Sequence, residues 1–212
     1  DGTFTSGAEI GDPPLDTLSS GGAATNLAPE HAGWHPVETR QHSGARSFGS
    51  GDAANACTTL EADVDLSAGQ SSQLSFWTVW DLEATYDGGI VQVSTNGGST
   101  WTTLSPAGGY PNTITHGGNA CAAMPSGTPA FSSDNQFTWQ QKSINLSAYA
   151  GQTVRIAWRY GSDTAVNGEG WFIDDLVRWR RRGRPAVLGT MDGVLVVAFE
   201  AGLFGDGFAG SE

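Results

Sequence analysis

The stretch that decides the fold is LSFWTVWDLEATYDGGIVQVSTNGGSTW, residues 74–101. Residues 74–79 alternate with a period of two, which is typical of a strand whose two faces differ. Residues 90–95 alternate in the same way, and Asn96-Gly97-Gly98 then supplies the positive φ that a hairpin turn requires. The stretch therefore predicts a strand, an acidic loop and a tight hairpin.

The rest of the chain repeats this pattern of short apolar runs separated by turn residues. It has 212 residues, 30 of them glycine, and no long stretch with helical periodicity. Such composition predicts an all-β domain with many strands. We expect strands at 35–41, 45–49, 58–66, 72–80, 89–95, 100–104, 138–146, 152–161 and 170–180. No apolar run approaches the ~20 residues of a membrane-spanning helix.

The chain divides into three parts by composition. Residues 1–33 are rich in Gly, Ala, Pro and Ser and predict an irregular segment. Residues 34–184 hold the expected strands, and residues 185–212 form a C-terminal tail. Within the tail, the run VLVVAF at 194–199 is strongly β-prone and predicts a strand that must pair, because an unpaired apolar strand promotes aggregation.

The charge of the chain argues against some partners. The net charge is −12, and five of the ten basic residues are arginines within residues 178–184. An acidic body excludes nucleic acid as the main partner, since phosphate binding requires the opposite sign. It suits a secreted protein and hard cations such as Ca²⁺. The arginine run is interpreted as a solvated strand end, or as a contact with the acidic surface of another copy.

The chain has two cysteines, Cys57 and Cys121. In a secreted chain they predict one disulfide, and the alternative is two unrelated buried thiols. The disulfide would hold the long Gly- and Pro-rich loop at 105–137, because Cys121 lies in its middle. Residue 1 is Asp and no signal sequence is visible, which fits a removed leader or an excised fragment.

Several phrases occur in an order that resembles a known family. They are Trp34-His35, His42-Ser43-Gly44, Ser50-Gly51-Asp52, Val64-Asp65-Leu66-Ser67, residues 74–101, Ile144-Asn145-Leu146-Ser147, residues 151–156 and residues 170–177. Together they resemble the accessory domain of secreted bacterial peptidases of the immune-inhibitor-A type, which is related to MAM domains. The resemblance implies a jelly-roll β-sandwich of the galactose-binding or MAM-like kind, with extended N- and C-terminal segments.

Acidic residues near loop ends suggest a structural calcium site. The strand at 170–177 carries Asp174 and Asp175, which are adjacent and are expected to face opposite ways, so that one points into the sandwich. A buried carboxylate requires a cation or several backbone amides. The resemblance favours Ca²⁺ bound by Asp52, Asp174 and Asp175, and the alternative is an inward Asp bonded to amides.

The sequence lacks the motifs of common enzymes and offers aromatic residues instead. It has no G-x-S-x-G element, phosphate loop or dinucleotide fingerprint, so we expect no catalytic activity. Trp80, Tyr86 and Tyr110 lie by polar or Gly-rich loops and are candidate platforms for sugar rings. Trp77, by contrast, is assigned to the core with the other tryptophans of the strands.

Two functional hypotheses remain. The first is a noncatalytic binding or accessory module of a secreted bacterial protein, which binds polysaccharide or an extracellular protein surface. The second is a subunit of an extracellular filament, because Phe199-Glu200-Ala201-Gly202 resembles the Phe-Glu-x-Gly phrase with which family domains open. In that case Val194, Val196 and Phe199 would complete the sandwich of a neighbouring copy by strand exchange.

Overall fold

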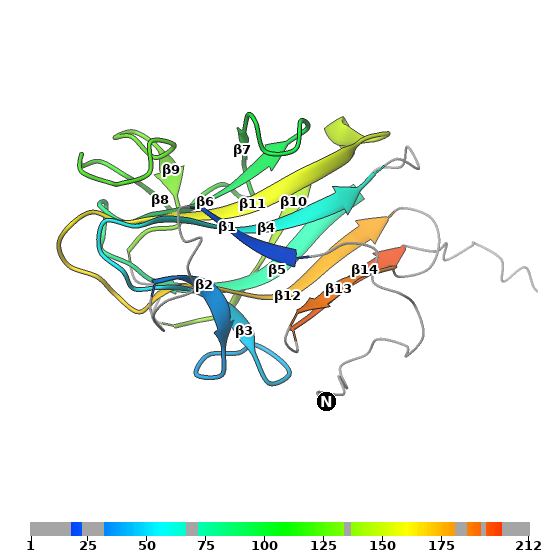
Figure 1. The fold of residues 1–212 in the computed structure, drawn as a ribbon, viewed down its shortest axis with the longest axis horizontal. Helices are drawn as coiled ribbons and strands as arrows, with labels where there is room; N and C mark the ends of the chain where they lie inside the picture. The colour runs from blue at the N-terminus through cyan, green and yellow to red at the C-terminus, as the bar shows by residue number, and fades with distance from the viewer. Residues whose placement is uncertain are drawn as a thin grey trace, which may run out of the picture.

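The structure is a computed structural model, and it describes residues 18–22, 32–66, 72–133, 137–180, 186–191 and 194–200. Most of the predicted irregular segment at 1–33 lies outside these residues. The chain forms a jelly-roll β-sandwich of two packed sheets (Figure 1). The described residues contain no α-helix, one short 3₁₀ turn at Ser147–Tyr149, and no helix that is long and apolar enough to cross a membrane.

The first sheet has five strands, all paired antiparallel. Their order across the sheet is β1 (Leu18–Gly22), β4 (Cys57–Asp65), β11 (Thr153–Gly161), β6 (Gly88–Ser94) and β7 (Thr102–Leu104). The predicted hairpin joins β6 to β7. Gly97 and Gly98 have φ of 68° and 95°, which the turn requires and most other residues avoid.

The second sheet has seven strands. Five follow one another in the order β10 (Gln140–Asn145), β5 (Ser72–Asp81), β12 (Gly170–Arg180), β14 (Val194–Glu200) and β13 (Ala186–Met191). The other two are β2 (Ala32–Val37), which pairs with β3, and β3 (Ser47–Gly51), which pairs with β12. A short pair, β8 (Asn112–Thr113) and β9 (Pro129–Ala130), folds the 105–137 loop on itself.

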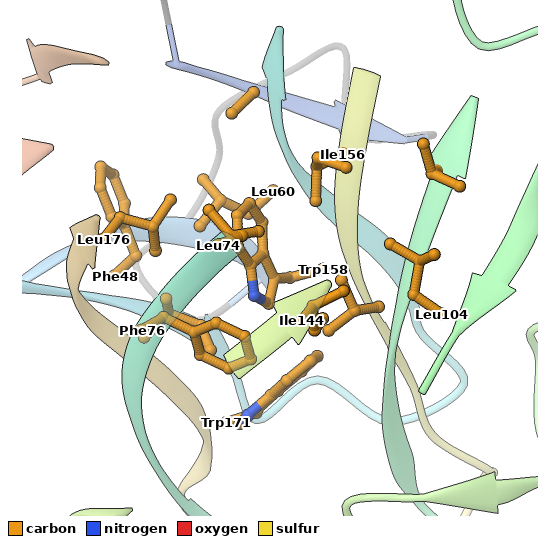
Figure 2. Close-up of a cluster of buried hydrophobic side chains, with 14 of the residues drawn as sticks. Phe48, Leu60, Leu74, Phe76, Leu104, Ile144, Ile156, Trp158, Trp171 and Leu176 are labelled. Atoms are coloured by element: carbon orange, nitrogen blue, oxygen red, sulfur yellow. The ribbon is translucent and has the colours of Figure 1, made fainter. Parts of the chain in front are cut away.

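The core lies between the two sheets and contains side chains from both of them (Figure 2). The residues that the alternation predicts as core are Leu74, Phe76, Val91, Val93, Val154, Ile156, Trp158 and Ile173, and all eight are buried. The predicted strands agree with the observed ones to within a few residues, because period-two alternation follows from burial of one strand face.

The two ends of the sandwich differ from the prediction. β1 pairs with β4 and precedes the expected start of the sandwich at residue 34. At the other end, the predicted strand at 194–199 is β14, which pairs parallel with Val177–Arg180 of β12 and antiparallel with β13. The apolar segment is thus paired within its own chain. Of the two alternatives for Val194, Val196 and Phe199, the structure shows the intramolecular one.

Deleting residues 185–212 tests this arrangement. We expect the truncated chain to be less stable, because β12 loses the hydrogen bonds of its pairing with β14 and becomes an edge strand there. Urea unfolding measures the loss, and sedimentation of the full-length chain over a range of concentrations should give a monomer. Large assemblies that form only with the tail present would instead support strand exchange.

Candidate functional site

The outer face of the β10–β5 pair carries two tryptophans. Leu74 and Phe76 of β5 are buried, so the strand period places Trp77 on the opposite face. The ring of Trp77 stacks on His42, with centroids 3.7 Å apart and planes inclined by 13°. Trp139, just before β10, meets His42 edge-on with centroids 5.9 Å apart. His42 is exposed and both tryptophans are half-buried. We call these three residues the aromatic patch.

Polar side chains lie on the same face beside the aromatic patch. Gln141 of β10 is directly opposite Trp77 in the ladder, and Asn145 is opposite Gln73. Residues directly opposite each other in an antiparallel pair share a face. Gln141, Gln73 and Asn145 are all exposed. The outer face therefore combines aromatic rings with amide groups that can donate and accept hydrogen bonds.

Arg40 and Phe137, which precede His42 and Trp139 by two positions, contact each other. The Arg40 guanidinium lies 3.6 Å from the centroid of the Phe137 ring. Its Nε donates to Glu169 Oε2 over 2.6 Å. Phe137 is 36% exposed, one of the few large apolar side chains at the surface of the described residues. The cation–π contact and the ion pair hold the arginine in place, although each is worth only ~1 kcal/mol or less at an exposed site.

Asp174 and Asp175 fix the turn that carries His42. Asp174 Oδ2 accepts hydrogen bonds from the amides of His42, over 2.7 Å, and Ser43, over 3.2 Å. Asp175 Oδ2 lies 2.6 Å from His42 Nδ1, and its Oδ1 accepts from the Ser43 hydroxyl over 2.5 Å. The expectation that the two carboxylates face opposite ways is wrong. β12 changes register between Asp174 and Val177, and Asp175 has a φ of 45°, so both carboxylates reach one turn.

The expectation that one of these acids points into the sandwich is also wrong. Asp174 is opposite Trp77 in the ladder and therefore lies on the outer face, where the turn at 42–43 buries it to 3% exposure. Burial and the charge of Asp175 raise the pKa of Asp174 to about 6, against the lowering effect of its amide hydrogen bonds.

The three acids predicted to bind calcium do not meet in one place. Asp174 and Asp175 bind the turn at 42–43, which matches the alternative of an acid bonded to amides. Asp52 is exposed at the end of β3. Within the described ranges, Asp52, Asp174 and Asp175 do not form a group of carboxylates whose oxygens lie within 4.8 Å of one another, whereas a different set of acids does.

That set consists of Glu83, Asp87 and Asp163, which we call the acidic cluster. Glu83 and Asp87 belong to the loop between β5 and β6, and Asp163 follows the end of β11. The Asp87 amide donates to the Glu83 carbonyl over 3.1 Å, and Asp87 Oδ1 accepts from the Asp163 amide over 3.0 Å. These bonds bring two segments that are far apart in the sequence to one end of the sandwich.

The acidic cluster is buried and incompletely paired. Asp87 has 0% exposure and Asp163 has 9%. Glu83 Oε2 and Asp87 Oδ2 are inaccessible and have no hydrogen-bond partner among the described residues. Burial raises the pKa of Asp87 to about 6, and the charges of Asp163 and Glu83 add to the increase. Buried carboxylate oxygens without partners are costly, so the cluster requires an explanation.

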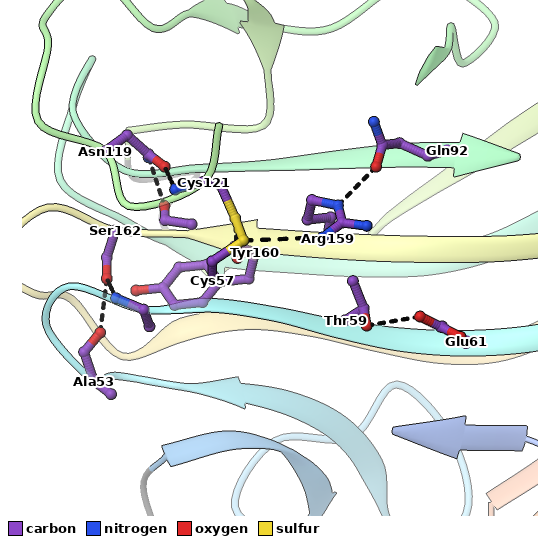
Figure 3. The surroundings of a disulfide bond; sticks show 12 residues. Ala53, Cys57, Thr59, Glu61, Gln92, Asn119, Cys121, Arg159, Tyr160 and Ser162 are labelled. Atoms are coloured by element: carbon purple, nitrogen blue, oxygen red, sulfur yellow. Dashed lines mark hydrogen bonds between the residues drawn. A yellow bond between two sulfur atoms is a disulfide. The ribbon is translucent and has the colours of Figure 1, made fainter. Parts of the chain in front are cut away.

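The predicted disulfide is present and lies beside the acidic cluster. Cys57 at the start of β4 is bonded to Cys121 in the long loop (Figure 3). Asn119 anchors the same loop, because its side-chain amide donates to the Tyr86 and Gly161 carbonyls, both over 2.9 Å. The loop at 105–137 is therefore held against β11 by a covalent bond and by hydrogen bonds.

Of two predicted platform residues, Trp80 lies in the interior and Tyr110 is half-buried. Trp80 is 2% exposed, and its indole N–H donates to the Ser132 carbonyl over 3.1 Å. Tyr110 packs against the core, and its hydroxyl donates to the Leu104 carbonyl and accepts from the Val91 amide. Burial raises the pKa of Tyr110 to about 12. The prediction is therefore wrong for Trp80, which is buried, whereas the half-buried Tyr110 stays a prediction.

The third predicted platform, Tyr86, remains at the surface. It is half-buried and stacks on the exposed His116, with centroids 4.0 Å apart and planes inclined by 9°. The His116 Nδ1 lies 2.9 Å from the Thr85 hydroxyl, which orients the imidazole. Tyr86 also connects to the acidic cluster, because it lies between Glu83 and Asp87 in the same loop.

Sequence reasoning missed the aromatic patch, and it did not separate Glu83, Asp87 and Asp163 from the other acids near loop ends. A usable signal existed for Trp77: it falls on the opposite strand face from Leu74 and Phe76, and this parity indicates the outer face rather than the core. No comparable signal existed for the acidic cluster. Many acids lie near loop ends, and only the folded chain brings Asp163 to Glu83 and Asp87.

Comparison with known families gives one match that covers most of the chain. The model of the family described as "Immune inhibitor A-like, MAM domain" matches residues 35–182. Bacillopeptidase F of Bacillus subtilis (strain 168) is 42% identical over 40 residues, which are 19% of this chain and 3% of that protein. The chain thus spans a very small part of this curated relative.

Solved structures of similar fold share little sequence with the chain. The K2 cleaved adhesin domain of Lys-gingipain is 17% identical, with 85% of this chain and 96% of that chain covered and a TM-score of 0.45. TmCBM61, solved in complex with beta-1,4-galactotriose, is 15% identical, with 78% and 88% covered and a TM-score of 0.41. Both likenesses concern the fold alone.

Proposed function

Because the chain belongs to the immune inhibitor A-like MAM domain family, we propose that it is a noncatalytic, extracellular accessory module that binds polysaccharide. The binding surface is the outer face of β10 and β5 around the aromatic patch. The observation that carries the proposal is the grouping of Trp77, His42 and Trp139 at the surface, on a sheet face that also presents exposed amides.

The chemistry of this face suits a sugar chain. Aromatic rings offer apolar area in a rigid geometry, and the C–H-rich face of a pyranose ring can stack on them. Binding sites for small polar ligands combine such rings with a few placed hydrogen-bonding groups. Here Gln141, Gln73 and Asn145 supply amides along the direction of the strands, so successive sugar units could contact successive side chains.

The surface is also held in place before any ligand binds. Asp174 and Asp175 make four contacts to His42 and Ser43, and His42 in turn stacks on Trp77. A rigid surface loses less conformational entropy on binding than a mobile one. Burial of Asp174 is costly, and in this proposal its role is to hold His42 in position for the ligand.

Affinity electrophoresis with a panel of soluble neutral and acidic polysaccharides tests this function. We expect Trp77→Ala and Trp139→Ala each to weaken binding of the retained polysaccharide by roughly tenfold, since one aromatic contact is worth ~0.5–1.5 kcal/mol beyond area burial. Trp101→Ala is the matched control, because Trp101 is a half-buried tryptophan near Arg159 on the other sheet. Melting curves establish that each variant folds.

Three results would contradict the proposal. One is that no polysaccharide of the panel retards the wild-type chain. A second is that Trp101→Ala weakens binding as much as Trp77→Ala. The third is that Tyr86→Ala abolishes binding while both variants of the aromatic patch retain it, which would assign recognition to the Tyr86–His116 pair.

A further inference from the structure

We propose that the pair Asn167-Gly168 is a site of spontaneous covalent modification, at which the asparagine amide is converted to aspartate and isoaspartate. The pair lies in the loop at 162–169, which joins β11 to β12. The chain contains a second Asn-Gly pair, Asn96-Gly97, in the hairpin turn between β6 and β7. The folded chain holds the two asparagines in different ways, so only the first of them is free to react.

The reaction begins when the Gly168 amide nitrogen attacks Cγ of the Asn167 side chain. A bond forms between these two atoms, the Cγ–Nδ2 bond breaks, and the amide proton of Gly168 leaves with Nδ2 as ammonia. Water then opens the cyclic imide, at Cγ to give aspartate or at the main-chain carbonyl carbon to give isoaspartate. Glycine favours the attack because it has no Cβ to restrict the backbone beside its nitrogen. Water is the only co-reactant.

The first argument is that neither reacting group is bound. Asn167 is exposed, and its side-chain amide makes no hydrogen bond to the part of the chain that the structure describes. The Gly168 N–H likewise has no acceptor there, whereas the next amide, that of Glu169, donates to Asp81 Oδ2 over 3.0 Å. Attack of Gly168 on Asn167 therefore requires no hydrogen bond within the described residues to be broken.

The second argument is the contrast with Asn96, which is equally exposed but bound on both sides of its amide. Asn96 Oδ1 accepts hydrogen bonds from the Ser94 hydroxyl, over 2.8 Å, and from the Thr100 amide, over 2.9 Å. Its Nδ2 donates to the Thr100 hydroxyl over 2.9 Å. The side chain must leave these partners before Gly97 can attack it, and each lost bond adds to the barrier. The hairpin turn therefore protects Asn96.

The third argument is that packing requires the glycine of the reactive pair. A Cβ at position 168 would lie 2.2 Å from the Asp81 carbonyl oxygen, so a larger residue does not fit there without moving the backbone. Asn167 has no such constraint, because its side chain is exposed. The close approach to Asp81 thus explains why glycine follows Asn167, and the reactivity of the pair is a consequence of this packing.

The two products should affect the loop differently. Aspartate adds a negative charge near Glu169 and leaves the backbone unchanged. Isoaspartate carries the chain through Cγ and lengthens the backbone directly before Gly168, which is packed on Asp81. Because Glu169 Oε2 accepts from Arg40 Nε over 2.6 Å, we expect isoaspartate to loosen this ion pair and the start of β12. Faster hydrogen exchange of the Glu169 amide in the isoaspartate form measures the effect.

The test incubates the full chain, with its disulfide intact, in mildly alkaline buffer and follows both asparagines by peptide mapping and mass spectrometry. In the folded chain we expect Asn167 to be converted faster than Asn96 by roughly tenfold or more, since the hydrogen bonds of Asn96 must first be broken. In urea the two asparagines should react at similar rates, because folding is what distinguishes them. Isoaspartyl methyltransferase labels the isoaspartate product in the same peptides.

Two variants separate the contributions of sequence and structure. Asn167→Gln keeps the amide but requires a larger ring for the same attack, so it should abolish modification of this loop. Its melting temperature should equal that of the wild type, because the Asn167 side chain is exposed and unbound. Thr100→Ala removes the acceptor of Asn96 Nδ2 at an exposed position, and it should accelerate conversion of Asn96 several-fold.

Each result supports or overturns the proposal. An Asn167 that stays intact in the folded chain while it reacts in urea would overturn it. Equal conversion of Asn96 and Asn167 in the folded chain would do the same, because the structure would then not distinguish them. Polysaccharide binding is an independent measurement, since the aromatic patch contains neither asparagine, and it stands or falls without this modification.

Discussion

Replacing Cys57 and Cys121 together by alanine should lower the free energy of unfolding by about 4 kcal/mol. The disulfide joins residues separated by 64 positions, and closing a loop of that length restricts the unfolded chain by about this amount in the chain-entropy description. Alanine is chosen because Cys121 is 1% exposed and packs with Ile114 and Met124, where a serine hydroxyl would need a partner.

Urea unfolding of the oxidised wild type, the reduced wild type and the double variant measures the effect. The reduced wild type should resemble the double variant, since both lack the same cross-link. A titration of the unfolded, unreduced wild type should find no reactive thiol. Equal unfolding midpoints for the oxidised wild type and the double variant would show that native contacts alone hold the 105–137 loop.

The double variant should lose order mainly in the loops near the disulfide. The loop contributes Ser132, whose hydroxyl accepts from the Thr85 amide over 3.0 Å, and Asn119, whose amide donates to the Tyr86 carbonyl. Both bonds hold the loop between β5 and β6 that carries Glu83 and Asp87. We therefore expect the double variant to loosen this loop, in addition to its lower global stability.

The strands could be predicted from the sequence because their pattern is local. Alternation in residues 74–79 reports which face is buried, and the structure buries Leu74 and Phe76. The same parity also gives the correct strand face for two tryptophans that the sequence analysis assigned wrongly. Trp80 shares the face of Leu74 and Phe76 and is core, whereas Trp77 lies on the other face and is at the surface. The position of a residue near an acidic loop was a weaker guide than its parity.

The candidate site could not be predicted in the same way, because it depends on contacts between distant segments. The turn at 42–43 reaches Asp174 and Asp175 across more than 130 positions, and a register shift in β12 lets both carboxylates reach it. Tyr110 resembles a loop residue in the sequence, and only the folded chain shows that its hydroxyl pairs with the Leu104 carbonyl and the Val91 amide.

Replacing Trp171 by alanine should destabilise the fold by ~3–5 kcal/mol, the usual cost of removing a large buried aromatic side chain. Trp171 is 0% exposed in the core between the sheets (Figure 2). Its ring lies 5.5 Å from that of Trp34 and 5.4 Å from that of Phe131, measured between centroids. It also covers Gly89 so closely that a Cβ there would lie 2.4 Å from the indole.

Trp171→Phe separates the two contributions of this side chain, packing and hydrogen bonding. The indole N–H donates to the Thr78 hydroxyl over 2.7 Å, and that hydroxyl donates in turn to the Phe172 carbonyl over 3.0 Å. Phenylalanine keeps most of the volume and loses the first bond, and a hydrogen bond of this kind contributes ~0.5–1.5 kcal/mol. The Thr78 hydroxyl keeps its acceptor, so no donor is left unpaired. We therefore expect Trp171→Phe to cost less than half as much as Trp171→Ala in a urea titration.

A cost of under about 1 kcal/mol for Trp171→Ala would contradict the prediction. The neighbouring rings would then have to collapse into the space, and the close packing of β12 on β6 would not be what holds the two sheets together.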